Sequence, residues 1–248
     1  MAAFELAHSA RADVFEIDIR LSKDGRLIVT HDASLVRTTN AKGLVADHTL
    51  EELKTLDAGY RFTDECNETP WRGKGLQLLE LSELFAAFPG IGINIDIKDA
   101  HEHAVKQVAS TLRTLNDGRW MNVGSFHPRI INAFRALAPE ISTAASQWDV
   151  ATQYFGRKLP NGVSRSLLKR AKGEVLQIPE QWRGLPLNTR AFIHHVQTQN
   201  RLVMYWTIND SITMQQLLER GANGLVSDNV LVAREVIDQF VASRQVLK

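Results

Sequence analysis

The fold of this chain follows from one stretch near its beginning, Phe15-Glu-Ile-Asp-Ile-Arg-Leu-Ser-Lys-Asp-Gly-Arg-Leu-Ile-Val-Thr-His-Asp32. Its first half alternates apolar and polar residues, which predicts a β-strand over residues 13–19. Side chains two residues apart share a face, so Glu16 and Asp18 point together to one side of that strand. Two ionised carboxylates are costly to bury, and this face must therefore meet a cation or strong hydrogen-bond donors.

The second half of the stretch turns back on the first. The connection Ser22-Lys-Asp-Gly25 is too short to hold a crossover helix, and Asp-Gly is a hairpin signal. A strand over residues 27–30 should therefore run antiparallel to its predecessor. It would return His31 to the end of the sheet at which the two acids lie.

Beyond the hairpin, apolar strands alternate with helical segments almost to the end of the chain. This order predicts an α/β fold with a parallel sheet covered by helices. The expected strands are 93–97, 121–126, 141–145, 175–178, 202–208 and 224–227, and the expected helices are 2–11, 101–116, 128–137, 188–199, 211–220 and 229–243.

The first strand and these later ones make seven strands in parallel order. A doubly wound open sheet could use seven, but no Gly-rich phosphate-binding fingerprint follows the first strand. A closed (β/α)₈ barrel needs one strand more, which we expect before Met1. We predict a single domain over residues 1–248, with an inserted loop region at about 35–80 over one mouth of the barrel.

Composition excludes several classes of partner. The 29 basic and 28 acidic residues create no field that would recruit nucleic acid or an anionic membrane. Cys66, the one cysteine, excludes an internal disulfide framework and a cysteine-based zinc site. No apolar run reaches the roughly 18 residues of a membrane span, and the first residues do not resemble a signal peptide. We expect no nucleic-acid partner, no integral membrane segment and a cytoplasmic location.

The strand Ile93-Asn-Ile-Asp-Ile-Lys98 carries a second polar face, made by Asn94, Asp96 and Lys98. Together with the first strand it brings three carboxylates and a lysine to the carboxyl ends of the strands, where barrel enzymes have their active sites. Oxygen ligands favour a hard ion such as Mg²⁺ or Ca²⁺ over zinc. His31 would be the proton carrier beside this ion.

At this level of detail the chain resembles the glycerophosphodiester phosphodiesterases, whose barrel is of the kind found in phospholipase C-like phosphodiesterases. The similarity covers essentially the whole chain and is highly specific as a set. The matching motifs are Glu16-Ile-Asp18, Lys23-Asp-Gly25, His31-Asp32, Arg37-Thr-Thr-Asn40, Leu53 to Gly59, Asp96-Ile-Lys98, Ser125-Phe126, Trp206-Thr-Ile-Asn-Asp210 and Gly221 to Asp228.

The resemblance implies metal-assisted hydrolysis of a glycerol phosphodiester to an alcohol and glycerol 3-phosphate. It implies a small-molecule or lysolipid phosphodiester as the substrate. The metal would stabilise charge on a phosphate oxygen while histidines move the protons. The implied roles are metal ligand for Glu16, Asp18 and Asp96, catalytic group for His31, phosphate neutralisation for Lys98 and pocket lining for Trp206.

The chain departs from the family pattern in several places, two of which bear on the chemistry of the site. The family's first strand, His-Arg-Gly, and the Pro-Glu-Asn-Thr turn after it would precede Met1, and with them one catalytic histidine. Asp96 is one methylene shorter than the usual glutamate, although toxin-type phospholipases D of the same superfamily place an aspartate there.

Two alternative functions remain open at this point. A truncated, catalytically impaired relative would only bind a metal or phosphate ester, and its unclosed barrel would invite self-association through two open strand edges. A phosphate-binding barrel isomerase fits the architecture but leaves the three carboxylates unexplained. At the residue level, Glu16 and Asp18 could instead lie on a solvated strand, and His31 could be a turn residue bonded to Asp32.

Overall fold

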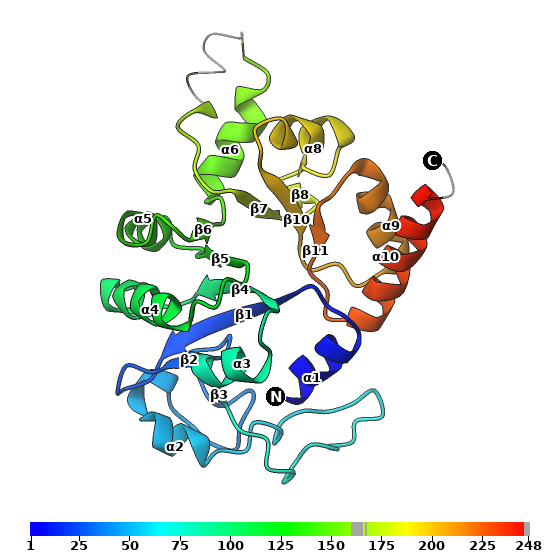
Figure 1. Cartoon of the computed structure of the whole chain (residues 1–248). Coiled ribbons are helices and arrows are strands. Elements are labelled where there is room, and N and C mark those ends of the chain that lie inside the picture. Colours follow the sequence, from blue (N-terminus) through cyan, green and yellow to red (C-terminus); the bar gives the residue numbers. More distant parts are fainter. Residues whose placement is uncertain (160–165, 167, 246–248) are drawn as a thin grey trace. The chain divides into compact units, whose positions relative to one another are not determined.

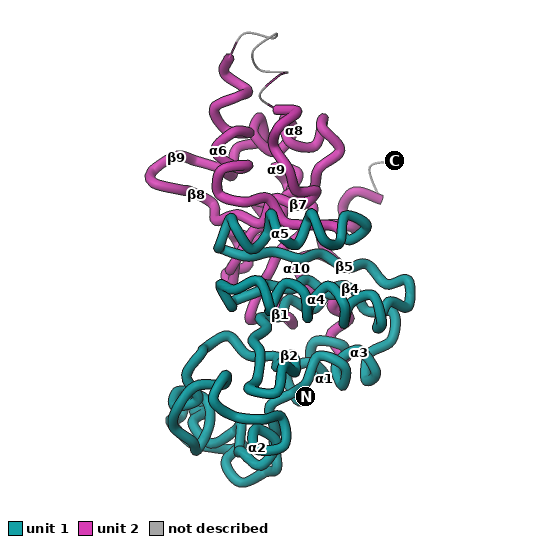
Figure 2. Tube along the Cα trace, turned by 90° about the vertical axis from the view of Figure 1, so that its left-hand side faces the viewer, with its two compact units in different colours: residues 1–8, 13–141 teal, residues 9–12, 142–248 magenta. Residues whose placement is uncertain are grey.

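The computed structural model describes residues 1–159, 166 and 168–245 (Figure 1). The chain divides into two compact units, which Figure 2 colours separately. Unit 1 contains residues 1–8 and 13–141, and unit 2 contains residues 9–12 and 142–248. The expectation of a single domain over residues 1–248 stays a prediction.

The sheet of unit 1 is built around the hairpin that opens the sequence. Its strands follow the order β3-β2-β1-β4-β5, with β1, β4 and β5 parallel and β2 antiparallel to both of its neighbours. The antiparallel pairing of residues 27–29 with the first strand is therefore confirmed. The strands are β1 (Val14–Leu21), β2 (Leu27–Val29), β3 (Leu79–Glu80), β4 (Gly92–Ile97) and β5 (Met121–Gly124).

The helices of unit 1 cover the apolar face of this sheet. Alternate residues of β1, among them Ile17 and Ile19, are buried, and so are Ile95 of β4 and Val123 of β5. Figure 1 shows α4 and α5 side by side on one flank of these strands. The helices are α1 (Ala2–Ser9), α2 (Leu50–Lys54), α3 (Leu81–Ala87), α4 (Glu102–Leu115) and α5 (Pro128–Leu137), with a 3₁₀ turn at Val45–Asp47.

The region 35–80, which the sequence predicts as an inserted loop, has a small core of its own. Leu35, Val45, Leu53 and Leu78 pack there with Ile28 of β2. The 3₁₀ turn and α2 lie within this region, and β3 at its end joins the sheet. The irregular composition concealed these short elements, because none is long enough to show a periodic pattern.

Unit 2 has a smaller parallel sheet in the order β11-β10-β7. Its core includes Leu176, Phe192, Val203 and Tyr205, all fully buried. The elements are β6 (Ser142–Thr143), α6 (Gln147–Gly156), β7 (Val175–Ile178), β8 (Gln181–Trp182), β9 (Leu185–Pro186), α8 (Arg190–Gln197), β10 (Leu202–Tyr205), α9 (Ser211–Arg220), β11 (Gly224–Leu225) and α10 (Val230–Gln245).

Some strand lengths differ from those expected. The apolar run 202–208 pairs only as far as Tyr205, and the strand expected at 141–145 is a pair of residues. Helix α6 and the β8–β9 hairpin were not predicted, although Ser146 and Asp149 form a capping box that marks the start of α6. Apolar character alone therefore overestimates a strand when neighbouring strands end earlier.

Candidate active site

Polar side chains gather on one face of β1 and β4 in unit 1. The parallel register sets Asp18 opposite Asp96 and Glu16 opposite Asn94. Asn94 is buried and accepts a hydrogen bond of 2.9 Å from Nδ2 of Asn122 on β5. Asp18 and Asp96 thus become neighbours across the strands, and the two amides bind each other on the same face of the sheet.

Lys98, just past the end of β4, bridges the two facing aspartates. Its Nζ lies 2.8 Å from Oδ1 of Asp18 and 2.6 Å from Oδ2 of Asp96. Its backbone N–H donates to the carbonyl of Ile19, which prolongs the β1–β4 pairing and fixes the base of the side chain. Burial lowers the pKa of Lys98, but the hydrogen bonds to both aspartates outweigh it, so the pKa is raised above its ordinary value.

Asp96 keeps one oxygen without a partner. Its Oδ1 is buried and has no hydrogen-bond partner among the described residues, in contrast to Oδ2, which accepts from Lys98. Burial raises the pKa of Asp96, and the hydrogen bond and charge of Lys98 offset this effect only in part. A buried carboxylate oxygen left unpaired is costly, which makes this atom a candidate ligand for a cation.

Asp18 and Asp96 fit a hard divalent cation, because both offer carboxylate oxygens and Oδ1 of Asp96 is unpaired. Glu16 is exposed on the same face, one pair of residues nearer the amino end. Within the residues that the structure describes, no three or more His, Cys, Asp or Glu side chains are grouped so that they could hold a metal ion. The expected third ligand therefore shares the face without joining a preformed cluster.

The hairpin delivers His31 to this end of the sheet, as expected. The N–H of Thr30 donates to the carbonyl of Asp18, and Nε of Arg20 donates to the carbonyl of His31 at 2.8 Å. The charge of His31 is close enough to lower the pKa of Asp96, the smallest of the contributions to that group. The backbone of the histidine is thus tied directly to β1.

Asp32 binds the His31 ring on one side and Arg37 on the other. Nδ1 of His31 is 2.7 Å from Oδ1 of Asp32, and Nε of Arg37 is 2.5 Å from Oδ2. The hydrogen bond from Arg37, together with the one from His31, holds the pKa of Asp32 well below its ordinary range. Asp32 therefore remains an ionised acceptor across the range in which histidine titrates.

Phe126 had no role in the sequence analysis beyond its place in a motif. It follows β5, and its ring centroid lies 5.3 Å from Nζ of Lys98. The preceding Ser125 donates from Oγ to the carbonyl of Ile97 at 2.7 Å, which fixes the turn that carries the ring. The signal that could have found it is its position, directly after a strand at the same edge of the sheet.

Trp206 belongs to unit 2 and follows β10, and its backbone N–H donates to the carbonyl of Ile178. It is partly buried. The other five predicted site residues all belong to unit 1, so the pocket-lining role of Trp206 stays a prediction.

Across residues 1–159, 166 and 168–245, no helix is both long and apolar enough to cross a membrane.

Comparison with known families gives a match over most of the chain. A model of the glycerophosphoryl diester phosphodiesterase family matches residues 1–232. The chain is 31% identical over 234 residues to a glycerophosphodiester phosphodiesterase of Bacillus altitudinis, which covers 92% of this chain and 87% of that protein. It is 22% identical over 259 residues to a lysophospholipase D of Mus musculus, with 96% and 77% covered.

Solved structures agree in fold. A glycerophosphoryl diester phosphodiesterase domain from Mycobacterium tuberculosis aligns with a TM-score of 0.79 at 20% identity and covers 94% of this chain and 91% of that one. A phosphodiesterase of Oleispira antarctica, solved in complex with the product sn-glycerol-3-phosphate, aligns with a TM-score of 0.72 at 23% identity and covers 95% and 90%.

These comparisons confirm the expected fold class, an α/β fold of the (β/α)₈-barrel type. They also confirm the expected activity class, a phosphoric diester hydrolase, and do not favour the alternative of a protein that only binds ligands. Enzymes of this kind generally depend on a divalent metal ion. The chain belongs to the glycerophosphoryl diester phosphodiesterase family.

Proposed function

We propose that this chain hydrolyses glycerophosphodiesters to an alcohol and glycerol 3-phosphate at the carboxyl ends of β1 and β4. One observation carries the location: Lys98 bridges Asp18 and Asp96 while Oδ1 of Asp96 stays buried and unpaired. A partly buried cation held between two carboxylates, one of which keeps an unpaired oxygen, is suited to phosphate and metal chemistry rather than to stability alone.

Asp18 and Asp96 would hold the divalent cation, Mg²⁺ or Ca²⁺, with Glu16 as the third ligand. Once bound, the cation supplies charge stabilisation at a phosphate oxygen. Lys98, held at the same two aspartates, adds a positive charge for the phosphodiester, and its hydrogen bond offsets part of the effect of burial on the pKa of Asp96. Asp96, although one methylene shorter than glutamate, still reaches the face that Asp18 occupies.

His31 is the proton carrier in this proposal. Nδ1 is engaged by Asp32, which leaves Nε2 to accept or donate a proton at the reacting oxygens. Trp206 would line the pocket, and its contribution would be apolar contact with the glycerol or alcohol portion of the substrate.

The substrate is a small glycerophosphodiester or a lysolipid phosphodiester. The Oleispira antarctica structure holds sn-glycerol-3-phosphate, and the mouse relative is a lysophospholipase D. Glycerophosphodiesters and lysolipid phosphodiesters share a glycerol phosphate portion and differ in the groups attached to it. A cytoplasmic location and self-association through strand edges stay predictions.

The test is release of choline, with Mg²⁺ or Ca²⁺ present, from two substrates. Glycerophosphocholine should give choline and glycerol 3-phosphate, and lysophosphatidylcholine should give choline and glycerol 3-phosphate that still carries its acyl chain. We expect His31→Gln to lower kcat about 10²–10⁴-fold, the usual cost of removing a positioned acid or base. His194→Gln is the matched control, because this histidine is exposed on α8.

Equal kcat in the wild type and His31→Gln would remove His31 from the mechanism. Absence of choline release from both substrates with both metals would contradict the proposed reaction.

A further inference from the structure

The His31 ring is largely exposed to solvent, and a hydrogen bond holds it at Nδ1. Its side chain is 62% exposed, so packing does not choose its rotamer. The contact that orients it is the 2.7 Å hydrogen bond between Nδ1 and Oδ1 of Asp32. An ionised carboxylate only accepts hydrogen bonds, so Nδ1 must carry the proton in this pair.

We propose that Asp32 and Arg37 are positioning residues that hold His31 as the Nδ1–H tautomer, with Nε2 available to the substrate. This inference rests on the proposed catalytic role of His31. Arg37 acts through Asp32: its Nε–H donates to Oδ2 at 2.5 Å, which fixes the plane of the carboxylate and keeps it charged. Neither residue needs to contact substrate.

The exposure of Arg37 argues against a purely structural role. Its side chain is 66% exposed and that of Asp32 is 24% exposed, and ion pairs of this kind add little to stability. The segment after Arg37 is held without it, because Thr39 is buried and its Oγ1 donates to the carbonyl of Leu35 at 2.8 Å. The Arg37–Asp32 pair can therefore serve the histidine ring without bracing the loop.

A second pair fixes the backbone of His31 independently. Arg20 donates from Nε to the His31 carbonyl at 2.8 Å and from Nη1 to Oδ1 of Asp99 at 3.0 Å. The other oxygen of Asp99 accepts from the N–H of Leu21 at 2.7 Å. With the backbone held in this way, the side-chain torsions of His31 are the freedom that Asp32 removes.

Nitrogen-15 NMR of the histidine side chains tests this directly, at about pH 8.5, roughly two units above the ordinary histidine pKa. The His31 resonances are identified by their loss in His31→Gln. We expect the Nδ1–H tautomer in the wild type and a shift toward Nε2–H in Asp32→Asn, because the amide can turn its NH₂ toward Nδ1. Arg37→Gln should give a mixture of the two.

The same variants should lower kcat about 10–100-fold and leave KM nearly unchanged, the usual size of such outer contacts. Arg37→Lys should restore only part of kcat, because lysine lacks the planar donor group. Arg113→Gln is the control: it removes a 2.6 Å ion pair with Glu140, whose side chains are 48% and 50% exposed, and neither residue is a proposed site residue.

An unchanged tautomer in Asp32→Asn would overturn the positioning role. Wild-type kcat in both Asp32→Asn and Arg37→Gln would also overturn it, provided that His31→Gln itself lowers kcat. The NMR result stands apart from the activity of His31. If His31→Gln keeps full kcat while the tautomer still shifts in Asp32→Asn, then the positioning contact is confirmed and the catalytic role of His31 fails.

Discussion

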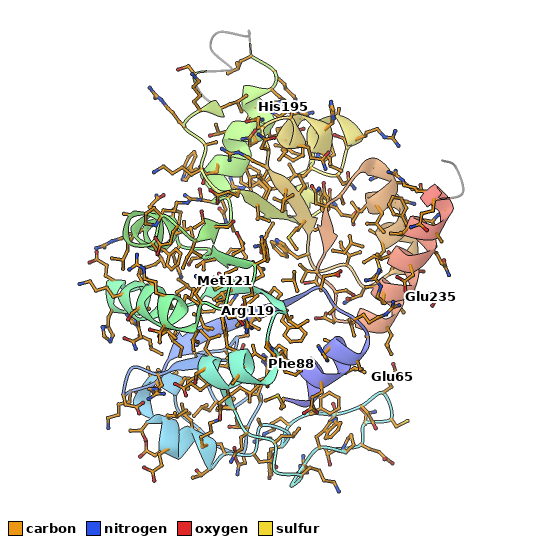
Figure 3. The ribbon with its side chains drawn as sticks, in the orientation of Figure 1. Glu65, Phe88, Arg119, Met121, His195 and Glu235 are labelled. Carbon is orange, nitrogen blue, oxygen red and sulfur yellow. The ribbon has the colours of Figure 1, made fainter. Side chains whose placement is uncertain are left out.

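The two ends of the sheet in unit 1 treat buried charge in opposite ways. At the amino end, Arg119 precedes β5 and its side chain is only 2% exposed. It donates to the carbonyls of Phe85 and Phe88, both at 3.1 Å, and to the carboxylate of Asp117. Arg119 and Phe88 are labelled in Figure 3. The guanidinium also lies 4.2 Å from the centroid of the Phe85 ring. Arg119 thereby satisfies carbonyls at the end of α3.

At the carboxyl end, Lys98 is shared between Asp18 and Asp96, and Oδ1 of Asp96 remains unpaired. Both arrangements are ion pairs at the ends of parallel strands, yet only the first is complete. Buried charge at the amino end therefore stabilises the fold, and we propose that the charges at the carboxyl end serve a ligand instead.

The largest expected effect comes from the carboxyl end. Asp96→Asn should lower kcat by about 10²-fold or more, equivalent to roughly 2.7 kcal/mol of barrier, because the amide is a poorer ligand for a hard cation. The midpoint of thermal unfolding should change by no more than about 4 °C, since the variant removes a carboxylate whose charge is costly to bury. Steady-state kinetics and thermal melts provide both numbers.

Activity of Asp96→Asn within a factor of two of the wild type would show that the unpaired oxygen has no part in the reaction. A large loss of stability would show instead that the carboxyl end serves the fold, as the amino end does.

The next largest effect comes from the amino end. Arg119→Met should lower the free energy of unfolding by about 2–4 kcal/mol, because it leaves the carbonyls of Phe85 and Phe88 without a donor. Urea titration measures this. The kcat per folded molecule should stay at the wild-type value, since Arg119 lies at the opposite end of the strands from the proposed site.

Asp117→Asn is the control for this variant. It keeps the carbonyl contacts of Arg119 and should therefore be milder than Arg119→Met. If the two variants are equally unstable, then the ion pair rather than the helix end accounts for the stability.

The smallest effect is a difference in pH dependence between the two ends. The hydrogen bond from Arg119 lowers the pKa of Asp117, so its stabilisation is present above the ordinary aspartate value of 3.8 and is lost as pH falls through the lower folded value. Burial raises the pKa of Asp96, so its contribution is present below 3.8 and is lost as pH rises through the higher folded value.

Urea titrations from about pH 3 to about pH 7, with a chelator present, should therefore give opposite trends. The stability difference between the wild type and Asp117→Asn should grow in favour of the wild type as pH rises. The difference between the wild type and Asp96→Asn should move against the wild type over the same range. Parallel trends for the two variants would contradict the contrast between the ends.

Local signals placed several elements accurately. Helix α5 starts at Pro128, which suits the first helical position, and α9 lies between its Asp210 cap and Gly221 with φ +105°. The strand over 202–208 was expected too long, because apolar residues continue beyond the point at which β11 stops pairing at Leu225. Helix ends are fixed by nearby residues, whereas strand ends depend on a partner distant in the sequence.

Alternation, turn residues and motifs are properties of residues that are close along the chain. The sequence therefore showed that Glu16 and Asp18 share a face, that the hairpin returns His31, and that the chain resembles a phosphodiesterase family. Only the tertiary structure decided that Asp18 faces Asp96, that Lys98 bridges them and that Asp32 links His31 to Arg37. These contacts depend on strand register and on side-chain geometry, which bring together residues up to about 80 positions apart. The candidate residues could thus be identified from the sequence, whereas the contacts of Asp18 and Asp96 follow from the register of β1 and β4.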